Sequence, residues 1–299
     1  MMIRSAGLRR QVALIVAFIA ALIARGALPL CVLGAAIGIA RAQEHASRWD
    51  GDARSAVRLI AGSAAAAGDA RLRAGIEIRL KAGWHTYWRH PGDAGVPPRL
   101  DFAGSANVKA VDVAWPAPQR IPEEGLTAIG YTGSFILPLV VSPQDPARPA
   151  RLRLKVEYAV CEKLCVPAEA RAELALAGGA SPEDDALRAA EARLPRKLAL
   201  GEGAGLAIRS VRRERGARVP RVVVDVAAPT EAKVELFAEG PGPEWSLPVP
   251  TAVAGAPIGL QRFTFDLDGA PPGARQDDIS LTLTAVTGSE TIEVTARLD

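Results

Sequence analysis

Two closely spaced cysteines are the residues of this chain whose type and spacing can do chemistry. Cys161 and Cys165 are separated by only three residues, 162–164. A cysteine pair can exchange with another disulfide, close a structural bridge, or ligate a metal ion. The spacing by itself is compatible with three interpretations: a structural disulfide, a redox-active pair and a metal site.

Alternating segments flank the cysteine pair on both sides. Apolar residues occupy the even positions of residues 151–160 and again those of residues 170–176, which is typical of strands with one buried face. In a straight strand, residues four apart lie about 13 Å apart, whereas a disulfide needs Cα atoms roughly 4.4–6.8 Å apart. We therefore predict a hairpin with residues 162–164 at its tip. Both cysteines have odd numbers, so we expect both sulfurs on its polar, exposed side.

A disulfide at this position would do little for stability. Disulfides act mainly by restricting the unfolded chain, and so short a loop gives the smallest effect. An exposed bridge of this kind is a candidate for exchange chemistry, which needs an accessible thiolate. Lys163 favours a thiolate and Glu162 opposes it, and the sequence leaves this balance open.

The densest cluster of aromatic and histidine residues lies at residues 84–90. Its members are Trp84, His85, Tyr87, Trp88 and His90. We predict a strand whose aromatic side chains fill a core or cover the cysteine loop. Alternatively, His85 and His90 join the cysteines to bind a soft metal such as Cu(I), or one of them tunes a cysteine pKa.

Other polar stretches predict no chemistry. Glu123-Glu124 indicates a solvated turn, residues 92–98 a loop, and the basic run at residues 212–215 the end of a surface strand. The chain contains no glycine loop for nucleotides, no Gly-x-Ser-x-Gly and no His-Glu-x-x-His. No cofactor or resident metal ion is expected.

The fold class predicted from period-two patterning is mostly β. We expect two immunoglobulin-like β-sandwich domains, residues 43–178 and 201–299, joined by a short helical linker at residues 179–200. The helix is predicted from Ser181 as a cap, Pro182 at the first helical position and the acids that follow.

The first 42 residues differ from the rest of the chain. They hold five arginines and no acid, and two apolar runs end in Ala40-Arg41-Ala42. This pattern predicts an export signal cleaved after about Ala42, with an uncleaved anchor as the alternative. The chain carries a net charge of +3, but the remaining residues hold 31 bases and 33 acids. That balance gives no support to nucleic-acid binding. Cys31 would leave with the signal, and the two remaining cysteines would lie in an oxidising compartment.

Three stretches together resemble the N-terminal periplasmic domain of the DsbD thiol:disulfide interchange family, and are closer still to its ScsB-type relatives linked to copper tolerance. These are residues 161–167 (CEKLCVP), residues 83–98 (GWHTYWRHPGDAGVPP) and residues 129–139 (IGYTGSFILPL) with Trp115-Pro116 ahead of them. The resemblance covers about residues 50–178. The cysteine spacing is shorter than in the best-known relatives.

The resemblance implies an immunoglobulin-like domain in the periplasm that relays electrons. It implies that Cys161 and Cys165 are the redox pair of a thiol:disulfide oxidoreductase-like carrier, with Cys165 attacking and Cys161 resolving. The implied partners are a membrane-embedded thiol transporter, expected on another polypeptide, and periplasmic thioredoxin-like oxidoreductases. The alternative is a non-catalytic module, either copper-handling or part of an envelope complex, with a structural disulfide.

Overall fold

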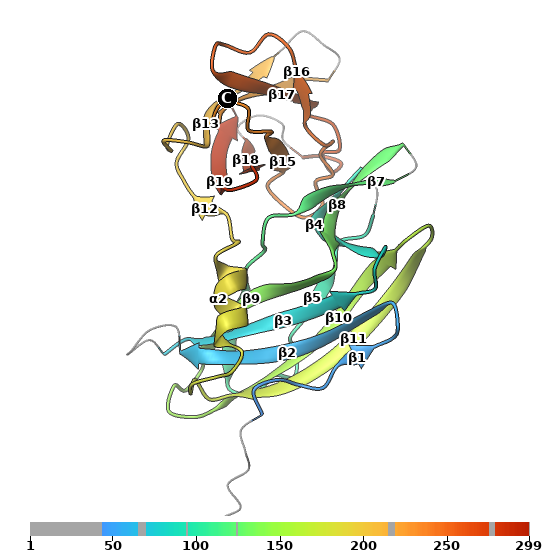
Figure 1. Ribbon diagram of the computed structural model, residues 1–299, viewed down its shortest axis with the longest axis vertical. Coiled ribbons are helices and arrows are strands. Elements are labelled where there is room, and N and C mark those ends of the chain that lie inside the picture. Colours follow the sequence, from blue (N-terminus) through green and yellow to red (C-terminus); the bar gives the residue numbers. More distant parts are fainter. Residues whose placement is uncertain are drawn as a thin grey trace, which may run out of the picture. The chain divides into compact units, whose positions relative to one another are not determined.

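The computed structural model describes residues 44–64, 70–93, 95–123, 125–214, 219–274 and 279–298. The predicted export signal lies outside the described residues, together with Cys31 and the cleavage site after Ala42. The signal and its cleavage therefore stay predictions. The fold is mostly β and sandwich-like (Figure 1), which confirms the predicted fold class. In the described part of the chain, no helix has the length and hydrophobicity needed to span a membrane.

Two sheets share the first hydrophobic core. One has the order β1-β2-β3-β9-β6, formed by β1 (Asp50–Gly51), β2 (Ser55–Ala64), β3 (Leu72–Leu80), β9 (Ser134–Pro143) and β6 (Val108–Val113). The other has the order β11-β10-β4-β8-β7, formed by β11 (Cys165–Leu176), β10 (Ala150–Cys161), β4 (His85–Gly92), β8 (Leu126–Thr132) and β7 (Gln119–Glu123). The short strand β5 (Arg99–Asp101) also pairs with β10.

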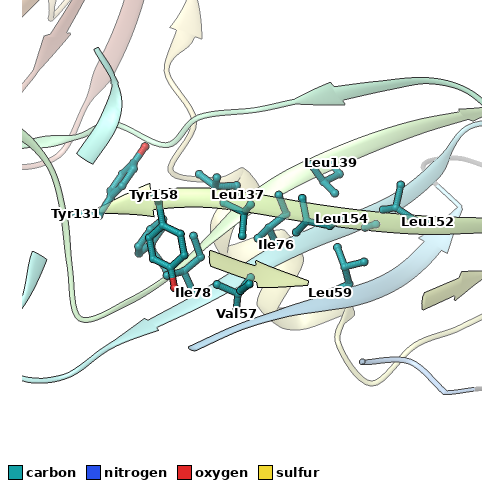
Figure 2. Packing of buried hydrophobic residues seen from close by; sticks show 14 of the residues in the cluster. Val57, Leu59, Ile76, Ile78, Tyr131, Leu137, Leu139, Leu152, Leu154 and Tyr158 are labelled. Atoms are coloured by element: carbon teal, nitrogen blue, oxygen red, sulfur yellow. The ribbon is translucent and has the colours of Figure 1, made fainter. Parts of the chain in front are cut away.

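The core between these sheets follows the alternation read from the sequence. Figure 2 shows Val57 and Leu59 of β2 and Ile76 of β3 together with Leu152 and Leu154 of β10, all of them buried. Burying one such aliphatic side chain is worth roughly 1.5–3 kcal/mol. Burial of the aliphatic side chains therefore determines which face of β10 points into the core. It also determines the orientation of Cys161 at the end of that strand.

A second pair of sheets follows in the chain. One has the order β12-β19-β18-β15, from β12 (Arg196–Lys197), β19 (Thr291–Leu298), β18 (Ile279–Val286) and β15 (Glu235–Glu239). The other has the order β13-β14-β17-β16, from β13 (Ala207–Glu214), β14 (Arg221–Ala227), β17 (Leu260–Asp266) and β16 (Thr251–Val253). Their inward residues, among them Val224, Phe263 and Leu283, form a core of their own. The predicted surface strand end is that of β13, and Arg215 lies outside the described residues.

The α-helix α2 (Asp184–Glu191) packs on the first pair of sheets. Leu187 is fully buried and reaches the glycines of β2 and β3, so closely that a Cβ at Gly75 would meet its Cδ2 at 2.8 Å. Arg73 of β3 donates two hydrogen bonds to Glu191 and a third, of 3.1 Å, to Asp184. The helix begins three residues after Ser181, whose hydroxyl donates to the carbonyl of Ala61.

The predicted domain boundaries, 43–178, 179–200 and 201–299, stay predictions. Within the predicted linker, β12 pairs in parallel with β19. Strand β4 also contacts the later part of the chain, because the guanidinium of Arg89 lies 2.7 Å from both Glu239 and Glu293. Next to it, the ring of Trp88 meets that of Phe237 edge-on, with centroids 6.0 Å apart.

Replacing the buried helix residue, Leu187→Ala, is expected to lower the free energy of unfolding by about 3 kcal/mol, since it leaves a cavity between α2 and the sheet. Urea unfolding followed by circular dichroism measures this. The control is Arg188→Ala on the exposed face of the same helix, with an expected change within about 0.5 kcal/mol. Equal losses in the two variants would show that Leu187 does not anchor the helix.

Candidate redox site

The hairpin of β10 and β11 brings the two cysteines together. The strands pair without interruption from Ala150↔Leu176 to Cys161↔Cys165, where the cysteines are cross-strand partners. Their Cα atoms are 4.1 Å apart and their sulfurs form a disulfide. The turn therefore lies at residues 162–164, as predicted.

Neighbouring strands add side chains to the same face of the sheet. Cys161 pairs with His85 of β4, and Tyr87, two residues further along β4, pairs with Gly130 of β8. Successive side chains of a strand point to opposite faces, so His85, Tyr87 and Cys161 share the face that points away from the main core. Tyr87 and Cys161 form a small buried cluster there with Ala128 and Ala159.

The two sulfur-bearing residues differ in exposure. Cys161 is only 2% exposed, whereas Cys165 is exposed. The predicted face is right for both residues, but the prediction that both are exposed is wrong for Cys161. Tyr87 and Ala128 cover that end of β10 from the outside. The alternation within residues 151–160 does not predict which other strands lie against this end.

The hydroxyl of Tyr87 lies between both sulfurs and a carboxylate. It is 3.0 Å from Cys161 Sγ, 3.1 Å from Cys165 Sγ and 3.2 Å from Glu123 Oε1. Burial, together with the negative charge and hydrogen bond of Glu123, raises the pKa of Tyr87 to about 12. Tyr87 therefore stays protonated at neutral pH and can donate its one hydrogen to any of these three acceptors.

Glu123 belongs to the site, so its prediction as part of a solvated turn is wrong. Its side chain is 20% exposed, and its Oε1 lies 2.5 Å from Nε2 of His85, which is itself buried. Glu123 ends β7, where the hairpin with β8 folds back along β4. The local pattern of two acids before a glycine indicates a turn but not which strand the turn lies against. Glu124 lies outside the described residues.

The two candidate histidines are separated by the fold. His85 lies beside Cys161, whereas His90 at the other end of β4 accepts a hydrogen bond from the Gly92 amide at its Nδ1. Burial lowers the pKa of His90. The alternative in which both histidines join the cysteines is therefore wrong for His90. Of the tryptophans in this segment, Trp88 belongs to the main core and Trp84 packs against that core.

The segment after β4 packs on the outer face of Tyr87. Gly95 has φ +121°, and a Cβ there would lie 2.3 Å from Cε1 of the Tyr87 ring. Only glycine allows this approach. Beyond it, Val96 and Pro97 line a shallow depression of about 540 Å³, and Cys165 and Pro167 line it as well. The exposed sulfur therefore borders an apolar groove.

Comparisons with known proteins identify a similar family and a similar fold. The family profile described as "Thiol:disulfide interchange protein DsbD, N-terminal" matches residues 56–177. Among solved structures, the N-terminal periplasmic domain of ScsB from Proteus mirabilis is similar, with a TM-score of 0.66 and 18% sequence identity. The similarity covers 86% of this chain and 99% of that one. No curated protein sequence matches the chain significantly.

The exposure difference predicts unequal reactivity of the two thiols after reduction. Iodoacetamide should modify Cys165 at least about tenfold faster than Cys161, because alkylation needs an accessible thiolate. Peptide mass spectrometry of samples quenched over time measures both rates. Unfolding in urea is the control, and the two rates should then converge. Equal rates in the folded protein would contradict the difference in burial.

Proposed function

Because residues 56–177 form a DsbD N-terminal-like domain, we propose that this chain carries out thiol–disulfide interchange with its Cys161–Cys165 disulfide. The observation that carries the proposal is the pairing of one exposed sulfur with one buried sulfur beside a hydroxyl donor. Exchange requires a sulfur that a partner can reach and a leaving thiolate that the protein can stabilise.

The direction of attack follows from access. In the reductive step, a donor thiolate attacks Cys165 Sγ, a mixed disulfide forms, and Cys161 leaves as a thiolate. A second donor thiol then attacks the donor's sulfur in the mixed disulfide, which releases Cys165 and leaves the donor oxidised. In the oxidative step, the Cys165 thiolate attacks an acceptor disulfide, and Cys161 then attacks Cys165 Sγ. This re-forms the internal bond and releases the reduced acceptor.

Tyr87 is positioned to assist both steps. In the disulfide form its hydroxyl donates to the Oε1 atom of Glu123, 3.2 Å away. When Cys161 becomes a thiolate, the same hydrogen can turn to that sulfur without movement of the ring, because the oxygen is already 3.0 Å from it. A hydrogen bond to a charged group is worth about 1.5–3 kcal/mol.

The partners follow from the family and are part of the proposal. Electrons arrive from a membrane-embedded thiol transporter and pass to thioredoxin-like oxidoreductases in the periplasm. The groove beside Cys165 supports a protein partner, because its apolar walls at Val96 and Pro97 offer a surface for the chain next to a partner's cysteine. Val96 is 58% exposed, so this contact surface is free in the chain alone.

Trapping tests the assigned roles. Mixed with a thioredoxin-like oxidoreductase in its disulfide form, the Cys161→Ala variant should accumulate a mixed disulfide through Cys165, because no resolving thiol remains. Non-reducing electrophoresis measures the adduct. The matched control is Cys165→Ala, in which the remaining thiol is buried and should give little adduct. The proposal fails if reduced wild-type protein does not reduce the oxidoreductase, or if the two variants trap it equally.

The hydroxyl donor is tested by Tyr87→Phe, which removes one oxygen and keeps the ring. The rate of disulfide reduction by dithiothreitol should fall about tenfold or more, since the leaving thiolate loses a hydrogen bond of about 1.5–3 kcal/mol. Thiol release followed with time gives the rate. Tyr158→Phe is the control, because its hydroxyl is hydrogen-bonded to Ser55 at 2.8 Å instead of to the sulfurs. Equal rates for the two variants would remove Tyr87 from the chemistry.

A further inference from the structure

Two polar side chains of the site, buried His85 and partly buried Glu123, form no bond to sulfur in the exchange chemistry. His85 and Glu123 contact each other next to the disulfide, and neither is needed to make or break a sulfur bond. The Nε2 or Nδ1 atom of His85, a carboxylate oxygen of Glu123 and the sulfur of Cys161 all lie within 4.8 Å of one another. Within the described ranges of the chain, this is the group of His, Cys and acidic side chains with metal-ligand spacing.

We infer that the reduced site binds a divalent ion of the zinc class through Cys161, Cys165, His85 and Glu123. Two thiolates, one imidazole and one carboxylate are a ligand set that Zn²⁺ accepts in tetrahedral geometry. In the disulfide form the sulfurs are bonded to each other and cannot act as thiolate ligands. Reduction therefore creates the site.

For three of the four ligands, the geometry requires only short movements. With metal–ligand bonds of about 2.0–2.3 Å, tetrahedral ligand atoms lie about 3.3–3.8 Å apart. The contact of His85 with Glu123, now 2.5 Å, has to lengthen by about 1 Å. The Cys161 sulfur approaches by a similar amount. The Cys165 sulfur, which lies outside this three-residue group, separates from Cys161 once the bond is broken and has to move toward His85 and Glu123. Side-chain rotation accounts for the shifts of His85, Glu123 and Cys161, and the edge position of β11 gives Cys165 room to move.

Tyr87 supplies support around the ligands. Its hydroxyl lies within 3.2 Å of both sulfurs and of Glu123. Hydrogen-bond donors of this kind around a metal site orient the ligands, and their loss typically costs roughly 10–100-fold in affinity.

Binding would change what the site can do. Each thiol loses a proton to the solvent when the ion binds, so two protons are released and no electrons move. Both thiolates are then held by the ion and are not free to attack a disulfide. The inference needs only a chemically reduced pair, so it can hold or fail independently of the exchange partners proposed above.

Titration of the reduced protein with Co²⁺ and then Zn²⁺ tests the site. With phosphine reductant and no oxygen, one equivalent of Co²⁺ should produce thiolate-to-metal charge-transfer absorption and intense tetrahedral d–d bands, both of which Zn²⁺ abolishes. Competition with a chromogenic chelator gives the Zn²⁺ affinity. The disulfide form is expected to show neither signal.

Matched variants separate this site from binding by the cysteines alone. His85→Gln and Glu123→Gln should each weaken Zn²⁺ binding at least about tenfold. The controls are His90→Gln, a buried histidine outside the group, and Glu77→Gln, whose side chain is 21% exposed against 20% for Glu123. Circular dichroism verifies folding of every variant.

Three results would overturn the inference. The first is the absence of stoichiometric Co²⁺ or Zn²⁺ binding by reduced wild-type protein. The second is an affinity that His85→Gln and Glu123→Gln leave unchanged, because the thiols then bind adventitiously. The third is tight binding of Cu(I) alone that depends on the cysteines and not on His85 or Glu123, as expected for a two-thiolate site.

Discussion

The twelve-residue ladder between β10 and β11 places the sulfurs opposite each other. Its register is fixed far from the cysteines, because Leu152, Leu154 and Val156 have to stay in the core between the two sheets. A slip of one residue would move this whole set to the other face and would also separate Cys161 from Cys165. The aliphatic core therefore determines which atoms can form the disulfide, and the short loop between the cysteines only closes the turn.

The chemistry of the pair depends on a second, smaller cluster on the opposite face of the same sheet. Tyr87 and Ala128 bury Cys161, while Cys165 at the edge strand stays exposed. The disulfide is therefore asymmetric although its two cysteines are direct partners in the ladder. In the proposed exchange, this asymmetry assigns the two sulfurs different roles. His85 and Glu123 lie beside Cys161, whereas the Tyr87 hydroxyl lies within 3.1 Å of both sulfurs.

Much of the fold and part of the candidate site could be predicted from the sequence, because the alternation of apolar and polar residues is a local property. It gave the mostly β class, the hairpin and the face on which both cysteines lie. The exposure of Cys161 could not be predicted this way, since its cover comes from β4 and β8, whose pairing with β10 depends on long-range contacts. The contact of Glu123 with His85 could not be predicted for the same reason. An acid beside a turn is usually solvated, and the sequence does not show that this turn lies against β4. The alternative of a soft-metal site with both histidines rested on residue type, and the five-residue separation of His90 from His85 along β4 places His90 outside the group formed by His85, Glu123 and Cys161.

The position of β11 at the edge of its sheet has a mechanical consequence. Cys161 lies on a strand that is paired on both sides, with β11 on one and with β4 and β5 on the other. Cys165 lies on a strand paired only with β10 in the sheet order. When the bond between them opens, the sulfurs need more room than a covalent bond leaves. Strand pairing restrains Cys161 from both sides and Cys165 from one, so we expect β11 and the tip at residues 162–164 to shift more than Cys161. The moving half of the pair is then also the half that a partner can reach.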